Sequence, residues 1–519
     1  MMLPGSPEEI AAFEKIQERL APLFQAVAND PRKPHSVVVV PSLSLDKAEL
    51  EKISGVHHYE ERLLYMLMLL RRPTMRLVYV TSQPLNPSIV DYYLQLLSGV
   101  PGNHARNRLH LLSCLDASAI PLSQKVLDRP RLQERILDAI PDHESAHLSV
   151  FNSTSLERSL AVSLGIPLYA TDPALWDLGT KSGCREVFRE AGVTFPDGFE
   201  RLRSEDDIVG ALAKLKIMHP ELRKAVVKLN DGFSGEGNAV FRFTGCPEEE
   251  SERPEWIRAQ LPSLGFEAKT ETWPTFKEKY AFMGGVVEQW IDGEGKRSPS
   301  CQCRVNALGQ AQIISTHDQV LGGPNGQVFL GCTFPADAEY RLDVQNDSFK
   351  VAQVLADKGV VGRFATDFVS VRSDNGWTHY AIEVNLRKGG TTHPFLTLKF
   401  LTDGIFDPQT GQFLTPTGRP KFYYASDTLY KPAYRGLSPD DLIDIAVYHG
   451  IHFHGASERG VVFHLMGALS EFGKLGLVCI GDNPQQARFL YNKTVQVLDT
   501  ETKRLHGERQ ARLLETDDA

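Results

Sequence analysis

The sequence is poor in cysteine and has no long apolar run. Its seven cysteines are scattered over 519 residues and none forms a Cys-x-x-Cys pair, which argues against a disulfide framework and favours a reducing cytoplasm. Cys301 and Cys303 share one face of a predicted strand and are interpreted as packing residues. The longest strongly apolar run, Leu63 to Leu70, is far too short to span a bilayer, and there is no secretory h-region. We therefore expect a cytoplasmic protein without a membrane partner.

The chain also lacks a basic run and the common nucleotide-binding signatures. Its 56 Lys and Arg against 65 Asp and Glu give a net charge of −9, so a nucleic-acid partner is not expected. Neither Gly-x-Gly-x-x-Gly nor a Walker sequence occurs. Apolar residues at 42% and charged residues at 23% are globular values, and the length allows two to four domains.

Strand-like and helical patterns alternate over the first third of the chain. This alternation predicts an α/β fold with a parallel, helix-covered sheet. The predicted strands cover residues 37–40, 77–80, 109–112, 148–151 and 167–170. The predicted helices lie near residues 58–71, 88–98, 122–139 and 155–164.

The segment from Gly362 to His393 carries the most informative pattern. It reads as two strands joined by a turn containing Asn375-Gly376, a strong hairpin signal. On the second strand Glu383, Asn385 and Arg387 alternate with Ile382, Val384 and Leu386, so that the two sets occupy opposite faces.

The register of this hairpin decides whether Asp367 joins the polar face. A three-residue loop, Asp374-Asn375-Gly376, puts Asp367 opposite Glu383, whereas a two-residue loop turns it to the other face. We choose the three-residue loop because it gathers Asp367, Glu383 and Asn385, whose oxygens suit Mg²⁺. On spacing alone, an edge hairpin with a solvated polar face is an equal alternative.

Two lysines and a glycine-rich loop precede this hairpin. Lys181 opens a short helix, and Lys228 lies on a predicted strand, residues 225–229, that leads into the loop Gly232-Phe233-Ser234-Gly235-Glu236-Gly237. Such a strand-to-strand loop can turn backbone N–H groups toward phosphate oxygens. Taken alone, a hairpin tip without a ligand is the more common explanation.

The segments between the loop and the hairpin, and those after it, are less specific. A strand at 286–291 ends at a turn containing Glu294, and residues 317–326 read as a long loop, either a lid or a surface excursion. Helices are predicted at 347–358 and 460–472. The histidines His449, His452, His454 and His464 have no convincing metal-ligand spacing.

The order of these pieces is more specific than any one of them. The chain resembles the ATP-grasp superfamily over about residues 175 to 400. It shares with that superfamily the order of its pieces: two lysines, a glycine-rich loop, a strand that carries Glu, a strand that carries Asp, and the motif Glu-x-Asn-x-Arg. Within it, the runs YEERLL (59–64), KSGCR (181–185), STHDQVLGGPNGQ (315–327) and GVVFHLMGAL (460–469) are similar to the family of the pheganomycin peptide ligase. The resemblance implies a Rossmann-like pre-ATP-grasp domain over 1–174, an ATP-grasp core of two α+β subdomains over 175–405, and a smaller α/β extension over 406–519.

The resemblance also implies roles for individual residues. The residues expected to bind ATP are Lys181, Lys228, Gly232, Ser234, Gly235, Gly237, Glu288, Gln289, Trp290, Ile291 and Glu294, with Glu288 and the backbone of 289–291 at the adenine edge and Glu294 at the ribose. Asp367, Glu383 and Asn385 are expected to bind two Mg²⁺, with Mn²⁺ as the alternative ion. Arg387 and Arg363 are expected to face the reacting carboxylate, and Arg304 is a third candidate by strand position.

Together these expectations predict an ATP-dependent carboxylate–amine ligase that forms a peptide or amide bond through an acyl phosphate. Its expected partners are small-molecule or peptide carboxylates and amines; the oligomeric state is open, with a homodimer as one option. One alternative is an ATP-binding regulatory or scaffolding module without turnover. Another is phosphoryl transfer without ligation.

Overall fold

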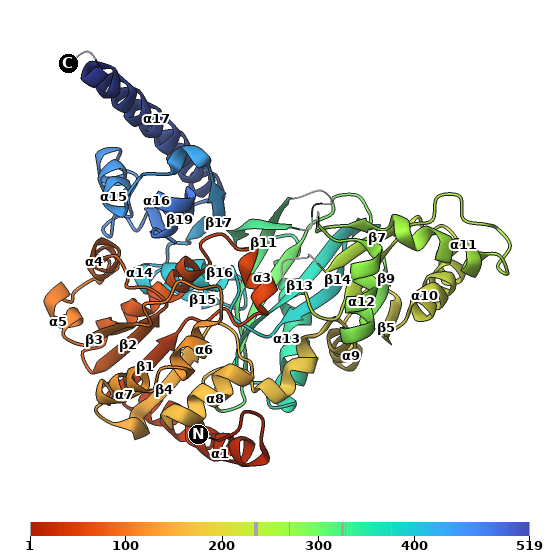
Figure 1. The fold of residues 1–519 in the computed structure, drawn as a ribbon, viewed down its shortest axis with the longest axis horizontal. Helices are drawn as coiled ribbons and strands as arrows, with labels where there is room; N and C mark the ends of the chain where they lie inside the picture. Colours follow the sequence, from red (N-terminus) through yellow and green to blue (C-terminus); the bar gives the residue numbers. More distant parts are fainter. Residues whose placement is uncertain are drawn as a thin grey trace.

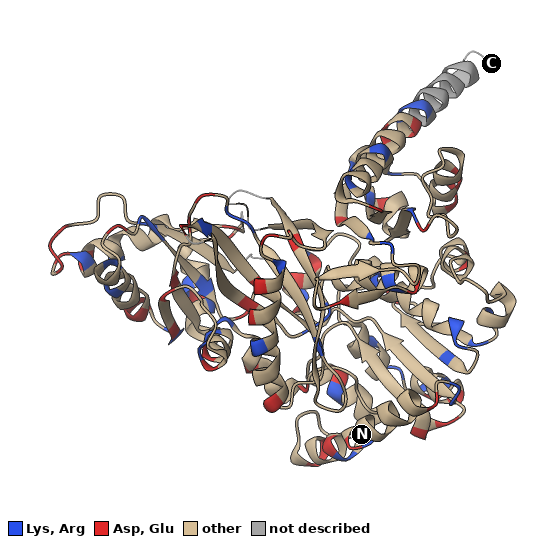
Figure 2. Cartoon of the chain, turned by 180° about the vertical axis from the view of Figure 1, so that it is seen from behind, with Lys and Arg blue, Asp and Glu red and all other residues tan. Residues whose placement is uncertain are grey.

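The computed structural model describes residues 2–232, 237–268, 270–322, 326, 328–374 and 376–517, with side chains up to residue 504. Three larger sheets organise this part of the chain, and β15 (Ile405–Asp407) and β16 (Gln412–Leu414) form a fourth, two-stranded sheet. In Figure 1 a parallel sheet and a smaller antiparallel sheet lie toward opposite ends of the body, with a large antiparallel sheet between them. Figure 2 shows Lys and Arg interspersed with Asp and Glu throughout.

The N-terminal sheet is parallel, as predicted, and its strand order is β3-β2-β1-β4. Its strands are β1 (His35–Val40), β2 (Met75–Thr81), β3 (Leu109–Ser113) and β4 (Ala146–Val150). Every residue of β1 is buried, because apolar side chains of both faces pack against helices. The helices are α1 (Pro7–Gln17), α2 (Leu20–Asn29), α3 (Lys47–Glu51), the 3₁₀ helix η1 (Val56–Arg71), α4 (Pro87–Gln95), α5 (Gly102–Arg106), α6 (Leu122–Leu127), α7 (Pro130–Asp138), η2 (His143–Ser145) and α8 (Ser155–Leu164).

Two predictions for this region need correction. The single helix expected over 122–139 is divided into α6 and α7, because Pro130 lies at the start of the second helix and cannot continue the first. The strand expected at 167–170 is reduced to one bridge between Leu148 and Leu168.

The smaller antiparallel sheet has the order β5-β9-β6-β7-β8. Its strands are β5 (Gly198–Leu202), β6 (Lys224–Leu229), β7 (Asn238–Arg242), β8 (Gly265–Phe266) and β9 (Gly285–Gln289). Leu212, Phe241 and Tyr280 belong to the core that joins this sheet to its helices. The helices of this part are η3 (Pro173–Gly179), α9 (Lys181–Ala191), α10 (Glu205–Met218), α11 (Arg253–Gln260), η4 (Leu261–Ser263) and α12 (Trp273–Met283).

The large sheet has eight antiparallel strands in the order β14-β13-β10-β11-β12-β17-β19-β18. They are β10 (Pro299–Val305), β11 (Ala311–Gly322), β12 (Val328–Phe334), β13 (Gly362–Ser373), β14 (Gly376–Asn385), β17 (Phe422–Tyr430), β18 (Gly460–His464) and β19 (Lys474–Gly481). Cys301 and Cys303 pack in its core with Val344 and Val351 of α13, as predicted. The remaining elements are α13 (Arg341–Asp357), α14 (Thr392–Thr402), β15 (Ile405–Asp407), β16 (Gln412–Leu414), η5 (Pro432–Tyr434), α15 (Pro439–Tyr448), α16 (Ala468–Phe472) and α17 (Pro484–Asp517).

The large sheet differs from the sequence interpretation in two places. Residues 317–322 are not loop but the end of β11, and His317 is buried against Tyr423. The helix expected over 460–472 is the strand β18 followed by the short helix α16.

Strands β17, β18 and β19 of the region after residue 405 belong to the same sheet as those of the central part, since Cys332 of β12 pairs with Ala425 of β17, whereas β16 pairs with β15 in a separate two-stranded sheet. The division at residues 174 and 405 stays a prediction. All seven cysteines are free. Within the described residues no helix combines the length and apolarity that a membrane crossing needs.

Candidate active site

The β13–β14 hairpin brings Asp367 directly opposite Glu383, so the predicted register is confirmed. The predicted turn is wrong, because Gly376 pairs with Ser373 and is already part of the ladder; Asn375 lies outside the described residues. A bulge between Asp367 and Phe368 restores the register, since Phe368 pairs with Ala381 and Ile382 is the extra residue. Ala381 and Val384 therefore enter the core, and Ile382 is displaced from its expected place among them.

The amide of Asn385 joins the two carboxylates. Its Nδ2 donates to Asp367 Oδ2 at 3.0 Å and to Glu383 Oε1 at 2.9 Å. Burial raises the pKa of Asp367, while Ser300, Lys181 and Arg387 act to lower it. Ser300 lies directly across from Asp367 on β10 and was not predicted, because the β10–β13 pairing joins distant parts of the chain.

This group is chemically suited to a hard divalent cation. Among the described residues no three His, Cys, Asp or Glu side chains are arranged to hold a metal ion, but the predicted set has only two carboxylates. A half-turn of the Asn385 amide would present Oδ1 in place of Nδ2. Mg²⁺ accepts such sparse oxygen sets because waters and substrate phosphates complete its shell, and Mn²⁺ has the same preference. The residues therefore fit the expected ion, and their role as ligands stays a prediction.

Lys181 reaches this group from the smaller sheet's side. Its Nζ contacts Glu383 Oε2. Burial lowers the pKa of Lys181 to about 8, and the neighbouring positive charge of Lys228 adds to the effect. A lysine with such a pKa is charged at neutral pH and loses its charge in mildly alkaline solution.

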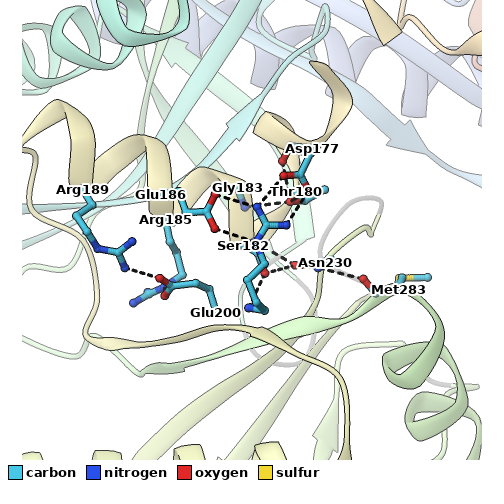
Figure 3. A network of polar contacts seen from close by, with 11 residues as sticks. Asp177, Thr180, Ser182, Gly183, Arg185, Glu186, Arg189, Glu200, Asn230 and Met283 are labelled. Carbon is cyan, nitrogen blue, oxygen red and sulfur yellow. Dashed lines mark hydrogen bonds and ion pairs between the residues drawn. The ribbon is translucent and has the colours of Figure 1, made fainter. Parts of the chain in front are cut away.

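The start of α9 is anchored so that Lys181 has a fixed position. Thr180 caps the helix by accepting from the Gly183 N–H at 3.0 Å. Asn230 accepts from the Ser182 N–H at 3.0 Å and from Ser182 Oγ at 2.6 Å. Its Nδ2 donates to the carbonyl of Met283 at 3.0 Å, as Figure 3 shows. One side chain thus ties α9 to the end of β6 and the end of α12.

Lys228 and Glu288 form a buried ion pair beneath this helix. Lys228 Nζ lies 2.5 Å from Glu288 Oε2, and Arg185 Nη1 lies 2.9 Å from Oε1. Burial on its own would raise the pKa of Glu288, but Lys228 and Arg185 outweigh burial and hold this pKa below its ordinary value. The Glu288 side chain is therefore engaged with two cations, and its expected contact with adenine stays a prediction. Arg185 was noted in the sequence only as part of a family run.

The glycine-rich loop is described only at its two ends. Leu229 N–H donates to the Gly237 carbonyl at 2.9 Å, and a Cβ on Gly232 would lie 3.3 Å from Gly237 Cα. Two backbones approach closely there, which only small residues permit. Ser234 and Gly235 lie outside the described residues.

The expected adenine and ribose residues follow β9. The Gln289 N–H donates to the Asp197 carbonyl at 2.8 Å, and the Trp290 N–H to the Lys224 carbonyl at 3.3 Å. The Ile291 carbonyl accepts from Lys296 Nζ at 2.8 Å. Glu294 is exposed and its backbone carbonyl accepts from the Arg372 N–H at 3.0 Å. These contacts fix the segment's backbone, and its expected role at the adenine and ribose stays a prediction.

The three predicted arginines do not converge on one point. Burial lowers the pKa of Arg387, and the negative charge of Asp367 opposes that effect, so Arg387 lies within electrostatic reach of the acidic group. Arg304 and Arg363 instead pair with each other across β10 and β13 and line a separate cavity. Their expected role at the reacting carboxylate stays a prediction.

Comparisons with known proteins found two matching family models and two related sequences. A family model described as IQCH-like, ATP-grasp matches residues 174–261, and one described as the PGM1 C-terminal domain matches residues 441–494. The chain is 30% identical over 471 residues to L-propargylglycine–L-glutamate ligase of Streptantibioticus cattleyicolor, covering 87% of this chain and 91% of that protein. It is 22% identical over 557 residues to IQ motif-containing protein H of Danio rerio, covering 95% of this chain but only 51% of that protein.

Solved structures share the fold. A biotin carboxylase from Campylobacter jejuni in a β-γ-ATP complex has a TM-score of 0.53 at 12% identity, with 88% of this chain and 90% of that chain covered. An N5-carboxyaminoimidazole ribonucleotide synthetase in an ADP complex has a TM-score of 0.50 at 11% identity, with 90% and 97% covered. At such low identity the likeness concerns the fold alone.

Proposed function

Because this chain belongs to the ATP-grasp ligase family that contains L-propargylglycine–L-glutamate ligase, we propose that it joins a carboxylate to an amine with the hydrolysis of ATP to ADP and phosphate. The observation that carries this function is the meeting of Asp367, Glu383 and Asn385 next to Lys181 in a relative of a ligase. We further propose amino acids or short peptides as substrates and a cytoplasmic location.

The residues have separate tasks in this reaction. We assign ATP phosphates to Lys181, Lys228 and the loop between Gly232 and Gly237, and Mg²⁺ to Asp367, Glu383 and Asn385. Bound Mg²⁺ would neutralise charge on the phosphate oxygens and orient the γ-phosphoryl group. Lys181 would then donate to a phosphate oxygen in place of Glu383.

The chemistry requires no nucleophile from the protein. A substrate carboxylate oxygen attacks the γ-phosphorus, the bond to the bridging oxygen of ADP breaks, and an acyl phosphate forms. The amine nitrogen then attacks the acyl carbon, inorganic phosphate leaves, and the amine loses its proton. Arg387 offsets the charge that develops on the acyl oxygens. Alignment of the two substrates and exclusion of water supply the remaining rate enhancement.

Substrate-dependent ADP formation tests this function. We expect ADP and phosphate to form only when both an acid and an amine are present, and hydroxylamine to trap the acyl phosphate as a hydroxamate. Asp367→Ala and Glu383→Ala should each lower turnover at least ~100-fold, because charge on the transferring phosphoryl group is no longer offset. Asp374→Ala, an exposed carboxylate on the same hairpin, serves as the matched control. An active Asp367→Ala/Glu383→Ala double variant would refute the site.

The second candidate is an ATP-binding module without turnover. It is suggested by the similarity to IQ motif-containing protein H over 95% of this chain, since the name of that protein gives a sequence motif and no reaction. In that case calorimetry would detect ATP binding while no acid and amine pair in an amino-acid panel released ADP. Hydroxamate formation with an acid alone, and no amide with any amine, would instead identify an acyl kinase.

A further inference from the structure

A cavity lies beside the large sheet, apart from the acidic group. It has a volume of about 560 Å³ and is lined by side chains of β10, β11, α13, β13, α14 and β15. Its wall combines the cations Arg304, Arg363 and Lys399 with apolar side chains that include Phe349, Phe395 and Phe406. A volume of this size holds a molecule of several hundred cubic ångströms, which is typical of substrate pockets.

The positive charge of this cavity is not balanced by the protein. Among the described residues that line it there is no Asp or Glu, and within the described part of the chain none of the three cations has a carboxylate partner in an ion pair. Arg304 and Arg363 occupy directly opposite positions on neighbouring strands, where like charges are destabilising. A bound anion would balance the positive charge of these three side chains.

The two arginines are held differently. Arg304 is fixed by Gln312, whose Oε1 accepts from Nε at 3.1 Å. Arg363 Nη1 is buried without a hydrogen-bond partner, and burial together with the charge of Arg304 lowers the pKa of Arg363. A buried guanidinium donor that is left unsatisfied is costly. Guanidinium groups pair with carboxylates through two parallel hydrogen bonds, so a ligand carboxylate would satisfy this donor.

The cavity is displaced along β13 from the acidic group, which favours a part of the substrate other than the reacting carboxylate. Arg363 and Asp367 are four residues apart on β13, which corresponds to about 13 Å of extended strand. Arg387, whose charge interacts with that of Asp367, is better placed for the reacting group. The cavity is therefore better placed to receive a part of the substrate that is distant from the reacting group.

We propose that this cavity binds the free C-terminal carboxylate and apolar C-terminal side chain of a peptide-like substrate. The carboxylate pairs with Arg304 and Arg363, Lys399 adds charge at the rim, and the phenylalanines surround the side chain. The inference deepens the proposed ligase function, since it names the chemistry of one substrate, but the binding itself requires neither ATP nor turnover.

A matched pair of unreactive probes tests the proposal by calorimetry on the full chain. The probes are N-acetyl-L-leucyl-L-phenylalanine and its C-terminal amide, which differ only in the charged group. We expect the acid to bind at least ~10-fold more tightly than the amide, as for a hydrogen-bonded charged group. Arg304→Gln and Arg363→Gln should each remove most of this preference. Lys350→Gln, which removes an exposed charge on α13 that is paired with Asp347, should retain it.

The outcomes separate the two proposals. Equal binding of acid and amide, no binding of either, or an unchanged preference in Arg363→Gln overturns the carboxylate pocket. Tighter binding of phenyl phosphate than of the acid, lost in the same variants, also overturns it in favour of a phosphate ligand.

A retained acid preference in a protein that shows no amine-dependent ADP formation supports the pocket and contradicts the ligase. Thermal unfolding of each variant identifies a fold defect, and the double variant Arg304→Lys/Arg363→Lys, which keeps both charges, then replaces the glutamine variants.

Discussion

Lys181 and Lys228 bring two positive charges near each other from different elements, α9 and β6. Lys181 contacts Glu383 directly, whereas Lys228 is held by Glu288. The first lysine can exchange its carboxylate partner for a phosphate, because its partner is itself a proposed metal ligand. The second is fixed by a buried pair that Arg185 completes. We infer that Lys181 changes its contact when ATP binds, whereas Lys228 keeps its ion pair with Glu288.

The depressed pKa of Lys181 predicts a pH dependence of nucleotide affinity. Burial holds this pKa at about 8, so the ammonium group loses its proton as the pH rises through 8 and its attraction for phosphate is lost. The affinity for MgATP should therefore fall between pH 7 and pH 9 in the unaltered protein. In Lys181→Met the affinity should be lower at pH 7 and change less over the same interval. Calorimetric titration at several pH values measures both; an equally steep decline in the variant would contradict the assignment.

The hairpin of β13 and β14 and the start of α9 are the elements that place the site. The hairpin depends on a bulge to keep Asp367 and Glu383 on one face. The helix start depends on Asn230, which bonds Ser182 and the carbonyl of Met283. The bulge and the Asn230 hydrogen bonds both hold side chains from separate segments at fixed positions, as a preorganised site requires.

Replacing Asn230 tests whether its hydrogen bonds hold the start of α9 in place. Asn230→Ala should lower the free energy of unfolding by roughly 1–3 kcal/mol, since Ser182 and Met283 lose buried hydrogen bonds. It should also weaken MgATP binding, because Lys181 loses its support. Urea denaturation and calorimetry measure these effects. Asn103→Ala, at an exposed position of α5, is the control, and equal stability of the two variants would contradict this role.

The molecule as a whole is joined by its large sheet. Strands from the region after residue 405 continue the sheet that carries the site. One apolar core contains Leu64 of the N-terminal region together with Phe395, Tyr423 and Phe463. The C-terminal part is therefore built into the sheet and the core and is not attached as a separate unit.

Truncation at residue 405 should expose this shared core. A chain of residues 1–405 loses β17, which is one of the two strands that pair with β12, and about half of the apolar residues in the core that contains Leu64, so we expect it to aggregate or unfold. Solubility, circular dichroism and the cooperativity of thermal unfolding measure the effect. A soluble 1–405 chain with cooperative unfolding close to that of the full chain would contradict the shared core.

Local patterns predicted the parallel sheet and the polar face of β14, because period-2 alternation and helix caps act over a few neighbouring residues. The pairing of Asp367 with Glu383 was predicted for the wrong reason. The prediction placed one extra residue of the second strand in the loop, whereas in the structure the extra residue is Ile382, in a bulge. The pairing of Arg304 with Arg363, and of β12 with β17, joins distant segments. Such pairings depend on tertiary packing and cannot be predicted from local patterns in a single sequence.

The central claim is that Asp367, Glu383 and Asn385 hold divalent cations beside ATP. Electron paramagnetic resonance of Mn²⁺, titrated into the protein with a non-hydrolysable ATP analogue, measures this binding without turnover. We predict nucleotide-dependent binding of Mn²⁺ to the unaltered protein and to Asp374→Ala, and its loss in Asp367→Ala/Glu383→Ala. Equal Mn²⁺ binding by the double variant and the unaltered protein would contradict the account.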